Sequence, residues 1–484
     1  MADPVDFVVK KLPDDLSSHG GLALVGRLFK RINLPALVDP KYPVQAKRGG
    51  IANSDILTCY LGLLSLGKND FEAVEGFRSQ RFVTQALGLR AVPSSVTLRH
   101  RFDAMGTEWS ELADQINRAI LGLHINGAPI DFGALSTGHL PLNIDTFVME
   151  QSDTAKEGVS YTYAGVDGYC PIALYLGTRG YGLELDLRAG NQHSACESEY
   201  NIERALGTAC AVSSAPLLLR ADAGFCSQHL MARALEQAAR LGPQLDLLIK
   251  WNPRSAPLEH IAAQRCADTS TLWRQLRAGK RECLWSEALP AIERQEGQSR
   301  AVRRAYRLSE RTIDKKGNAL LLPEYVLEGW TTTLGPQVSN EEVIALYRDH
   351  ATHEQFHAEF KTDMDLRRLP SGKFATNHLV CALAAVAMNL LRLVGQNTLH
   401  ESDSPMRKAA LRRRIKTVMQ EMMFKATRII SHARGWVLGV SGSDSGFAVF
   451  ERAFGKMLAT QRPRRAKHRS SEITDPHKRG ALRG

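Results

Sequence analysis

The sequence predicts an α/β protein with a mixed-sheet core, a β-rich insertion in that core, a helical N-terminal domain and a basic, helical C-terminal region. Three observations lead to this prediction. Helical patterns dominate residues 1–138, short β-rich runs broken by Gly and Asp begin at about residue 141, and strand and helix patterns then alternate. We therefore expect domains over 1–138, 139–400 and 401–484, for which 484 residues are enough.

The N-terminal domain contains two candidate helices around a turn, in addition to an apolar helix predicted over 55–66. The first would cover 82–87 and end at Gly88, and the second would begin at Ser94 or Ser95 as its N-cap. Such a pair fits helix-turn-helix DNA recognition or plain helical packing, and the sequence leaves both open.

The core begins with short runs rich in β-branched and aromatic side chains, and later runs resemble buried strands. These predicted strands cover 142–149, 159–166, 170–177, 215–222 and 245–251. Helical patterns separate the later strands at 191–206 and 227–241. Residues 255–325 are charged and β-leaning, and the α/β pattern resumes after them, so we interpret them as an insertion.

The basic excess is concentrated at one end of the chain. Residues 401–484 contain 19 Lys and Arg against 7 Asp and Glu, a net charge of +12, whereas the other 400 residues carry 43 and 44, a net charge of −1. Two clusters stand out, Arg412, Arg413 and Arg414 with Lys416, and the segment 462–469. A solvated basic tail is one interpretation. The other is an electrostatic grip on phosphates, which predicts nucleic-acid binding but no particular reaction.

Composition also limits the compartment. The apolar run 379–391 has thirteen residues, fewer than the roughly 20 that cross a bilayer, so we expect a buried helix and no membrane partner. No basic segment followed by an apolar run begins the chain, and the eight cysteines show no CxxC pattern. These features predict a cytoplasmic protein with reduced thiols.

A helix is predicted to start at Ser339, which forms a capping box with Glu342. At about 100° per residue, a polar stripe falls within an arc of about 60°, with Phe356 and Phe360 on the opposite, core-facing side. The stripe consists of Tyr347, His350, Glu354 and Lys361. A solvated face with charge pairs would explain it as well as a functional site.

The same helix contains His353-Glu354-Gln355-Phe356-His357, which matches the H-E-x-x-H pattern of zinc proteases. A third ligand is hard to find downstream, because no Glu follows Glu359 until Glu401, leaving only Asp363 and Asp365. A protease also has no need of a strongly basic C-terminal region. We therefore keep the zinc metalloprotease as a weaker alternative.

Two other carboxylates lie where strands are predicted to end. Asp145 lies in the first strand of the core, and Asp222 follows an apolar run, with Gly224 allowing a sharp turn. Acids at strand ends converge at one edge of a sheet, where a helix carrying Glu354 could join them. Three carboxylates provide the oxygen ligands that Mg²⁺ prefers, and a pair of such ions supports phosphodiester cleavage and strand transfer.

In this order and spacing, Asp145, Asp222 and Glu354 resemble the catalytic triad of the DDE transposases of bacterial insertion sequences, which have an RNase H-like core. The family carries Tyr-x2-Arg-x3-Glu-x6-Lys on its Glu helix, and this chain has the same spacing with His350 in place of Arg. Further similar segments are LLLRADAGF, RLPSGKFATN, AAVAMNLLRL and the stretch 157–190. The resemblance covers about residues 140–440.

The resemblance implies an RNase H-like catalytic core over 139–400 and roles for individual residues. Asp145, Asp222 and Glu354 would hold Mg²⁺ or Mn²⁺, and the contacts to DNA would come from Tyr347, Arg348, His350, Lys361, Arg412, Arg413 and Arg414. The partners would be double-stranded DNA at the inverted-repeat ends and at the target, bound by a homodimer through the helical N-terminal domain and the basic C-terminal region. The expected setting is the bacterial cytoplasm, on the nucleoid. A derived protein that binds DNA without cleaving it is the second hypothesis.

Overall fold

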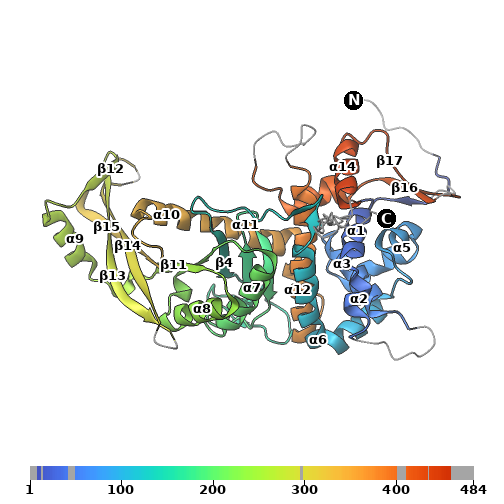
Figure 1. Cartoon of the computed structure of the whole chain (residues 1–484), viewed down its shortest axis with the longest axis horizontal. Helices are drawn as coiled ribbons and strands as arrows, with labels where there is room; N and C mark the ends of the chain where they lie inside the picture. Colours follow the sequence, from blue (N-terminus) through green and yellow to red (C-terminus); the bar gives the residue numbers. More distant parts are fainter. Residues whose placement is uncertain are drawn as a thin grey trace, which may run out of the picture.

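The computed structural model describes residues 8–11, 15–41, 50–294, 298–314, 316–399, 410–433 and 435–458. The molecule is elongated, with the insertion strands at one end, the α/β sheet in the middle, and N-terminal helices beside C-terminal elements at the other end (Figure 1). The predicted basic cluster at 462–469 lies outside the described residues.

The central sheet is mixed and has nine strands in the order β12-β13-β14-β15-β11-β10-β4-β8-β9. Its three parallel strands are β4 (Leu140–Thr146), β10 (Leu217–Ala221) and β11 (Leu245–Trp251). The hairpin of β8 (Ile172–Leu176) and β9 (Tyr181–Asp186) continues the sheet antiparallel to β4. The carboxyl ends of β4 and β10 therefore meet at one edge, which confirms the predicted mixed α/β sheet.

Helices cover both faces of this sheet because successive side chains of a strand point to opposite faces. On β10, Leu217 and Leu219 pack in the cluster that includes α7 (Ser198–Val212) and α8 (Gln228–Leu241). Leu218 packs on the other side, with α10 (Asn340–Arg348).

The longest helix, α6 (Ser95–Leu121), packs along α12 (Phe374–Gln396). The two helices approach closely at Gly106, where a Cβ would lie 2.9 Å from the carbonyl carbon of Ala375. Although α12 is long and apolar enough to cross a membrane, its residues are buried between α6 and β9 as a core helix. Helix α6 is kinked at Met105, and its first half buries Leu98 and Phe102, so helical packing and helix-turn-helix recognition both stay open for this segment.

The other N-terminal helices form a compact group beside α12. The predicted helix over 55–66 is confirmed as α3, which is buried along its whole length, its polar residues Asn53, Ser54, Asp55 and Thr58 included. The group consists of α1 (Leu22–Ile32), α2 (Leu34–Val38), α3 (Asn53–Leu64), η1 (Phe71–Val74), α4 (Glu75–Arg78) and α5 (Arg81–Leu87). Short strands β2 (His124–Ile125) and β3 (Ala128–Pro129) lead into the core.

The β-rich insertion extends the central sheet and does not form a separate one. Its strand β15 pairs antiparallel with β11, so the sheet continues outward to β12. The elements are α9 (Leu258–Ala267), β12 (Trp273–Arg277), β13 (Lys280–Glu293), β14 (Ser299–Ile313) and β15 (Ala319–Thr332). The predicted limits of 255–325 include α9, whose helical structure the β-leaning pattern did not predict, and they cut through β15, whose ladder with β14 runs on to Thr332.

The C-terminal region differs from the helical prediction, because it contains a β-hairpin. Strand β16 (Thr427–His432) pairs with β17 (Gly435–Val440) and also with β1 (Leu16–Ser17) near the other end of the chain. Alternating β-branched and aromatic side chains favour strands here over a helix. The helical elements are α13 (Ile415–Val418), the π-turn η8 (Met419–Met423) and α14 (Phe447–Leu458), which packs on α1.

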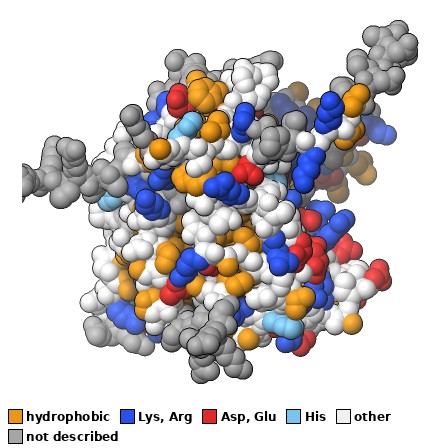
Figure 2. Space-filling view, turned by 90° about the vertical axis from the view of Figure 1, so that its right-hand side faces the viewer, with side chains coloured by type: hydrophobic (Ala, Val, Ile, Leu, Met, Phe, Trp, Pro, Cys, Tyr) orange, Lys and Arg blue, Asp and Glu red, His pale blue; other side chains and the backbone are white. Residues whose placement is uncertain are grey.

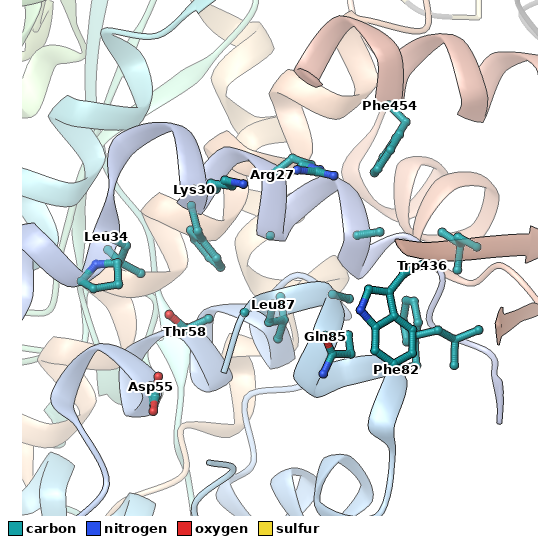
Figure 3. A pocket seen from close by; sticks show the side chains of 18 of the residues that line it. Arg27, Lys30, Leu34, Asp55, Thr58, Phe82, Gln85, Leu87, Trp436 and Phe454 are labelled. Carbon is teal, nitrogen blue, oxygen red and sulfur yellow. The ribbon is translucent and has the colours of Figure 1, made fainter. Parts of the chain in front are cut away.

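A cavity of about 500 Å³ lies between these N-terminal and C-terminal elements. Figure 3 shows Trp436 and Phe454 on one side of it, and Arg27 and Lys30 from α1 on another. Figure 2 views this end of the molecule and shows Lys and Arg side chains spread over the face among hydrophobic ones. The backbone pairing of β1 with β16 and the packing of α14 on α1 thus join the predicted first and third domains.

Candidate metal centre

The structure brings the two strand-end carboxylates together. Ile144 on β4 and Ala221 on β10 are register partners in a parallel pair, so the residues that follow them, Asp145 and Asp222, lie side by side. Asp222 also starts a 3₁₀ turn, because its Oδ1 accepts a hydrogen bond from the Gly224 N–H at 2.9 Å. The pairing predicted from the sequence for these two acids is therefore present.

The two carboxylates have different electrostatic surroundings. Burial and the neighbouring Asp145 charge raise the pKa of Asp222 above its ordinary value. Burial also acts to raise the pKa of Asp145, but hydrogen bonds from His353 and His357 outweigh it and hold that pKa well below its usual range. Asp145 and Asp222 are adjacent, and burial disfavours the charged form of Asp222. A cation would stabilise two such carboxylates.

An open cavity of about 640 Å³ lies beside both acids. Its lining residues are Asp145, Thr146, Tyr161, Thr162, Tyr163, Gly190, Asn191, Gln192, His193, Ser194 and Asp222. Tyr161 and Tyr163 are 67% and 72% exposed, so their rings are available to a ligand. The sequence singled out neither tyrosine, because both lie in the run 159–166, which is predicted only as a strand.

The expected continuous helix after Ser339 is broken into four pieces. Ser339 caps α10 as predicted, accepting from the Glu342 N–H at 3.1 Å. The chain then passes through the 3₁₀ turn η5 (Asp349–Thr352), the helix α11 (His353–Ala358) and the π-turn η6 (Glu359–Asp363). Because 3₁₀ and π turns advance by angles other than about 100° per residue, the predicted polar stripe does not share one face.

Members of the predicted stripe consequently lie in different environments. His350 is buried, and its Nδ1 lies 3.2 Å from Asn143 Oδ1. Glu354 is exposed on α11, and no hydrogen bond or ion pair of its side chain occurs within the described part of the chain. Tyr347 is half-buried between Trp330 and His350. The role of Glu354 as a metal ligand therefore stays a prediction.

The two remaining predicted DNA contacts on this segment lie apart. Arg348 is exposed at the end of α10. Lys361 lies over the Phe147 ring, with its Nζ 5.6 Å from the ring centre, and borders another hollow together with Arg367. As Phe147 directly follows β4, Lys361 is close to the carboxylate edge, and both basic residues stay predicted contacts.

The two histidines of the H-E-x-x-H segment, which are one helical turn apart, take the place expected for Glu354 and contact Asp145. His357 Nε2 lies 3.2 Å from Asp145 Oδ2, and His353 Nε2 contacts the same oxygen. The ligand atoms of these three residues all lie within 4.8 Å of one another. The carboxylate that contacts both histidines comes from β4, more than 200 residues earlier in the chain, and not from the segment downstream of Glu359.

A buried arginine beside the site was not predicted. Arg220 is 1% exposed; its Nε donates to Asn143 Oδ1 at 2.8 Å and its Nη1 to the Leu346 carbonyl at 2.5 Å. Burial lowers the pKa of Arg220 to about 10. The cation lies at the C-terminal end of α10, where the helix dipole favours it, and so holds the start of η5 against β10. The sequence feature that could have pointed to this residue was a single Arg within the apolar run LLLRAD.

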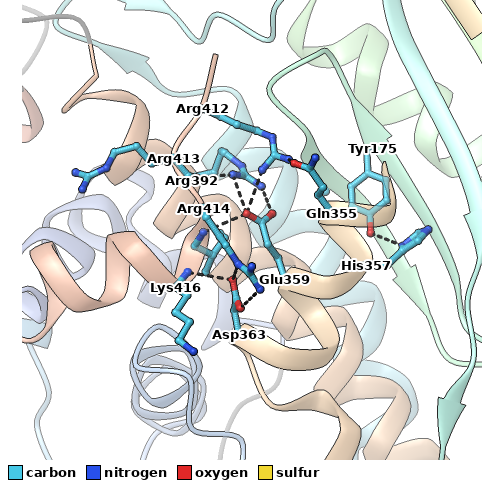
Figure 4. Close-up of polar contacts among 12 residues, drawn as sticks. Tyr175, Gln355, His357, Glu359, Asp363, Arg392, Arg412, Arg413, Arg414 and Lys416 are labelled. Carbon is cyan, nitrogen blue, oxygen red and sulfur yellow. Dashed lines mark hydrogen bonds and ion pairs between the residues drawn. The ribbon is translucent and has the colours of Figure 1, made fainter. Parts of the chain in front are cut away.

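The predicted arginine cluster is engaged in ion pairs inside the chain (Figure 4). Arg412 donates to Glu359 Oε1 at 3.1 Å and to Gln355 Oε1 at 2.6 Å, and Arg414 holds Asp363 through two bonds of 2.7 and 2.8 Å. Arg413 is buried and pairs with Glu421. Arg412 and Arg414 thus join α11 and η6 to the C-terminal region, whereas Arg413 pairs within that region, and this structural role was not part of the phosphate prediction.

Fold and site together define an α/β protein with paired carboxylates and a carboxylate–histidine centre at the carboxyl ends of its central strands. The chain belongs to the family described as Transposase DDE domain group 1, which matches residues 8–457. No curated protein matches the chain. Among solved structures, it is similar to the cryo-EM structure of the piggyBac transposase synaptic complex with hairpin DNA, with 14% identity, a TM-score of 0.40, and coverage of 84% of this chain and 80% of that one.

Proposed function

We propose that the protein is a transposase that cuts DNA at the ends of an insertion sequence and joins the 3′ ends to target DNA. The observation that carries this proposal is the adjacency of Asp145 and Asp222 beside an open cavity of about 640 Å³, in a chain of the DDE transposase family. The sheet supports an RNase H-like core, since three antiparallel strands, β9, β8 and β4, are followed by the parallel strands β10 and β11.

Asp145 and Asp222 would hold divalent cations, Mg²⁺ or Mn²⁺ in the simplest form of the proposal. When bound, such cations activate an attacking oxygen and stabilise the leaving one. We keep Glu354 in the proposal as the third carboxylate of the family signature. The chain's own part is to fix the acids rigidly on β4 and at the Asp222 turn, since catalysis of this kind depends on positioning and charge neutralisation.

Double-stranded DNA is the proposed partner, and a homodimer would engage two ends. The cavity has exposed aromatic rings at Tyr161 and Tyr163, and Lys361 carries positive charge close to the carboxylate edge. Phosphate contacts of Lys and Arg position DNA without reading its sequence. We place this activity on the nucleoid in a bacterial cytoplasm. The zinc-protease alternative is not proposed, because the chain belongs to a transposase family.

The test is cleavage of a DNA duplex carrying the sequence that flanks the gene, with Mg²⁺ or Mn²⁺, by wild type and by Asp145→Asn, Asp222→Asn and Glu354→Gln. We expect metal-dependent nicking by wild type and a loss of at least about 1,000-fold in the aspartate variants, because each removes a charged ligand. DNA binding without cleavage by every protein, wild type included, would favour the second hypothesis of a binding protein.

A further inference from the structure

We propose that Asp145, His353 and His357 form one binding site for a transition-metal dication, of the Mn²⁺, Co²⁺ or Zn²⁺ type, and that Glu354 is not a ligand of that cation. The inference deepens the proposed function, on which it rests for the use of the cation in DNA cleavage. It gives Asp145 two imidazole partners for this cation, so that the Glu354 carboxylate kept in the proposed function would serve only a cation shared with Asp222.

The three ligand atoms lie close enough together to converge on a single small cation, although His353 Nε2 lies nearer to Asp145 Oδ2 than two ligands of one metal do. A metal with ligands about 2.1 Å away separates neighbouring ligand atoms by roughly 3 to 4 Å. The separation of His357 Nε2 from Asp145 Oδ2 is 3.2 Å, and all three ligand atoms lie within 4.8 Å of one another. His353 and His357 supply Nε2 atoms from one side of α11 because four residues make about one helical turn.

Hydrogen bonding shows what His353 Nε2 requires. The Nδ1 of His353 contacts the His350 carbonyl oxygen, which can only accept, so Nδ1 must carry the hydrogen. In the neutral ring, Nε2 then presents a lone pair to the oxygen of Asp145. A lone pair facing a carboxylate is unfavourable, so either a proton on Nε2 donates to Asp145 or a bound metal ion replaces that proton.

The remote nitrogen of each histidine is oriented as in metal-binding histidines. His353 Nδ1 donates to a backbone carbonyl, and His357 Nδ1 lies 3.0 Å from the hydroxyl of the buried Tyr175. Such partners fix ring orientation in metal sites. Packing adds rigidity, since the His357 ring lies 4.4 Å from that of Phe147. These contacts are independent of Asp145, yet they aim both Nε2 atoms at it.

The donor set selects the class of metal. Imidazole nitrogen suits Zn²⁺ and Co²⁺ better than Mg²⁺, which prefers an all-oxygen octahedron, and Mn²⁺ binds such a site more weakly than Co²⁺ does. Three protein ligands leave coordination positions open for water or a phosphate oxygen on the side of the cavity that Asp145 lines. Glu354 is exposed on α11, between two histidines that face Asp145, and so lies outside this set.

The experiment measures metal binding by the full-length protein without DNA. Co²⁺ is the probe, because its visible spectrum reports nitrogen ligands; titration calorimetry with Co²⁺, Zn²⁺, Mn²⁺ and Mg²⁺ gives stoichiometry and affinity. We expect one tight Co²⁺ site with an affinity at least about 100-fold above that for Mg²⁺. His353→Asn and His357→Asn should each weaken Co²⁺ binding by more than about tenfold and change the spectrum. Tyr175→Phe should weaken it by about tenfold with the spectrum kept.

Two further variants separate the ligand sets. Glu354→Gln should keep the Co²⁺ affinity and spectrum of wild type, and so should His260→Asn, whose histidine is exposed on the distant helix α9. Circular dichroism and thermal melting show that each variant is folded. Mg²⁺ binding as tight as Co²⁺ binding, or a loss in Glu354→Gln equal to that in His353→Asn, overturns the inference.

The outcome is distinct from that of the cleavage assay. A protein that binds Co²⁺ through both histidines but never nicks DNA keeps this inference and sinks the proposed function. A protein that nicks DNA, and whose His353→Asn and His357→Asn variants bind Co²⁺ like wild type, keeps the function; the histidines then form only a hydrogen-bonded cluster with Asp145, and the inference fails.

Discussion

Glu359 and Arg392 form an ion pair in which each side chain is only 1% exposed. The pair joins the π-turn η6 to the core helix α12, and Arg412 and the Ile415 N–H each add a hydrogen bond to Glu359 Oε1 at 3.1 Å (Figure 4). The segment that carries His353 and His357 is therefore anchored to the rest of the protein by a buried charge network, just beyond the metal centre.

Replacing Glu359 with Gln should destabilise the protein by about 3 to 5 kcal/mol, because it leaves the buried Arg392 charge without its carboxylate. Urea unfolding measures this change. The control is Glu324→Gln, which removes an exposed partner of Arg311 and should cost less than about 1 kcal/mol. Equal losses in both variants would show that the buried pair contributes no more than a surface pair.

Substitution of Asp222 by Asn should raise stability by about 1 kcal/mol at pH 7 without metal, while abolishing cleavage. Burial and Asp145 raise the pKa of Asp222, so stability that depends on its protonated form is complete at low pH and is lost as pH rises. Asn keeps the oxygen that accepts from Gly224. Thermal melting checks whether Asp222→Asn is more stable than wild type. This difference in stability should shrink or reverse when a divalent cation binds wild type. A variant less stable than wild type without metal contradicts this account.

A pH dependence is expected from Asp246, a buried residue on β11 away from the metal centre. Burial raises its pKa, but hydrogen bonds from His139, Thr333 and Arg300 outweigh that effect and lower the pKa well below its usual range. The stabilisation from ionised Asp246 is therefore present above the unfolded pKa of about 3.9 and is lost as pH falls below it.

Asp246→Asn should accordingly cost about 2 kcal/mol or more at pH 7, and the difference from wild type should shrink toward pH 3. Urea unfolding at the two pH values measures both numbers. A constant difference between pH 7 and pH 3 would mean that the carboxylate charge is not the source of the stabilisation.

Gly180 should be intolerant of a side chain for two separate reasons. Its φ of +70° is unfavourable for other residues, and a Cβ there would overlap the ring of Phe356 on α11. Gly88 has the same φ of +70° with open space around it. Gly88→Ala should thus cost about 1 kcal/mol and Gly180→Ala about 3 kcal/mol.

Urea unfolding and Co²⁺ titration of both variants test this comparison. Only Gly180→Ala should also weaken Co²⁺ binding, since moving Phe356 moves the histidines on either side of it. Similar behaviour of the two variants would show that Phe356 accommodates the methyl group.

Much of the architecture follows from local patterns. The apolar runs that end at Asp145 and Asp222 predict two strands whose terminal carboxylates lie close together. The parallel pairing of β10 with β4 confirms this prediction. The prediction of one continuous helix with a 3.6-residue period is wrong after Arg348, because the turn geometry of η5 and η6 depends on what the segment packs against. Phe356 and Phe360 are nevertheless fully buried, as predicted, since an apolar ring finds the core whichever turn carries it.

By itself the sequence determined the mixed α/β sheet, the β-rich insertion and the adjacency of Asp145 and Asp222. It also showed the resemblance to transposases. All of these depend on short-range periodicity and on motif spacing. Only the tertiary structure decided which groups surround Asp145. The 3₁₀ turn rotates α11 so that His353 and His357, rather than Glu354, face β4, and no local pattern encodes that rotation. It is set by long-range contacts, such as Phe356 against Gly180 and Glu359 against Arg392, that join residues far apart in the chain.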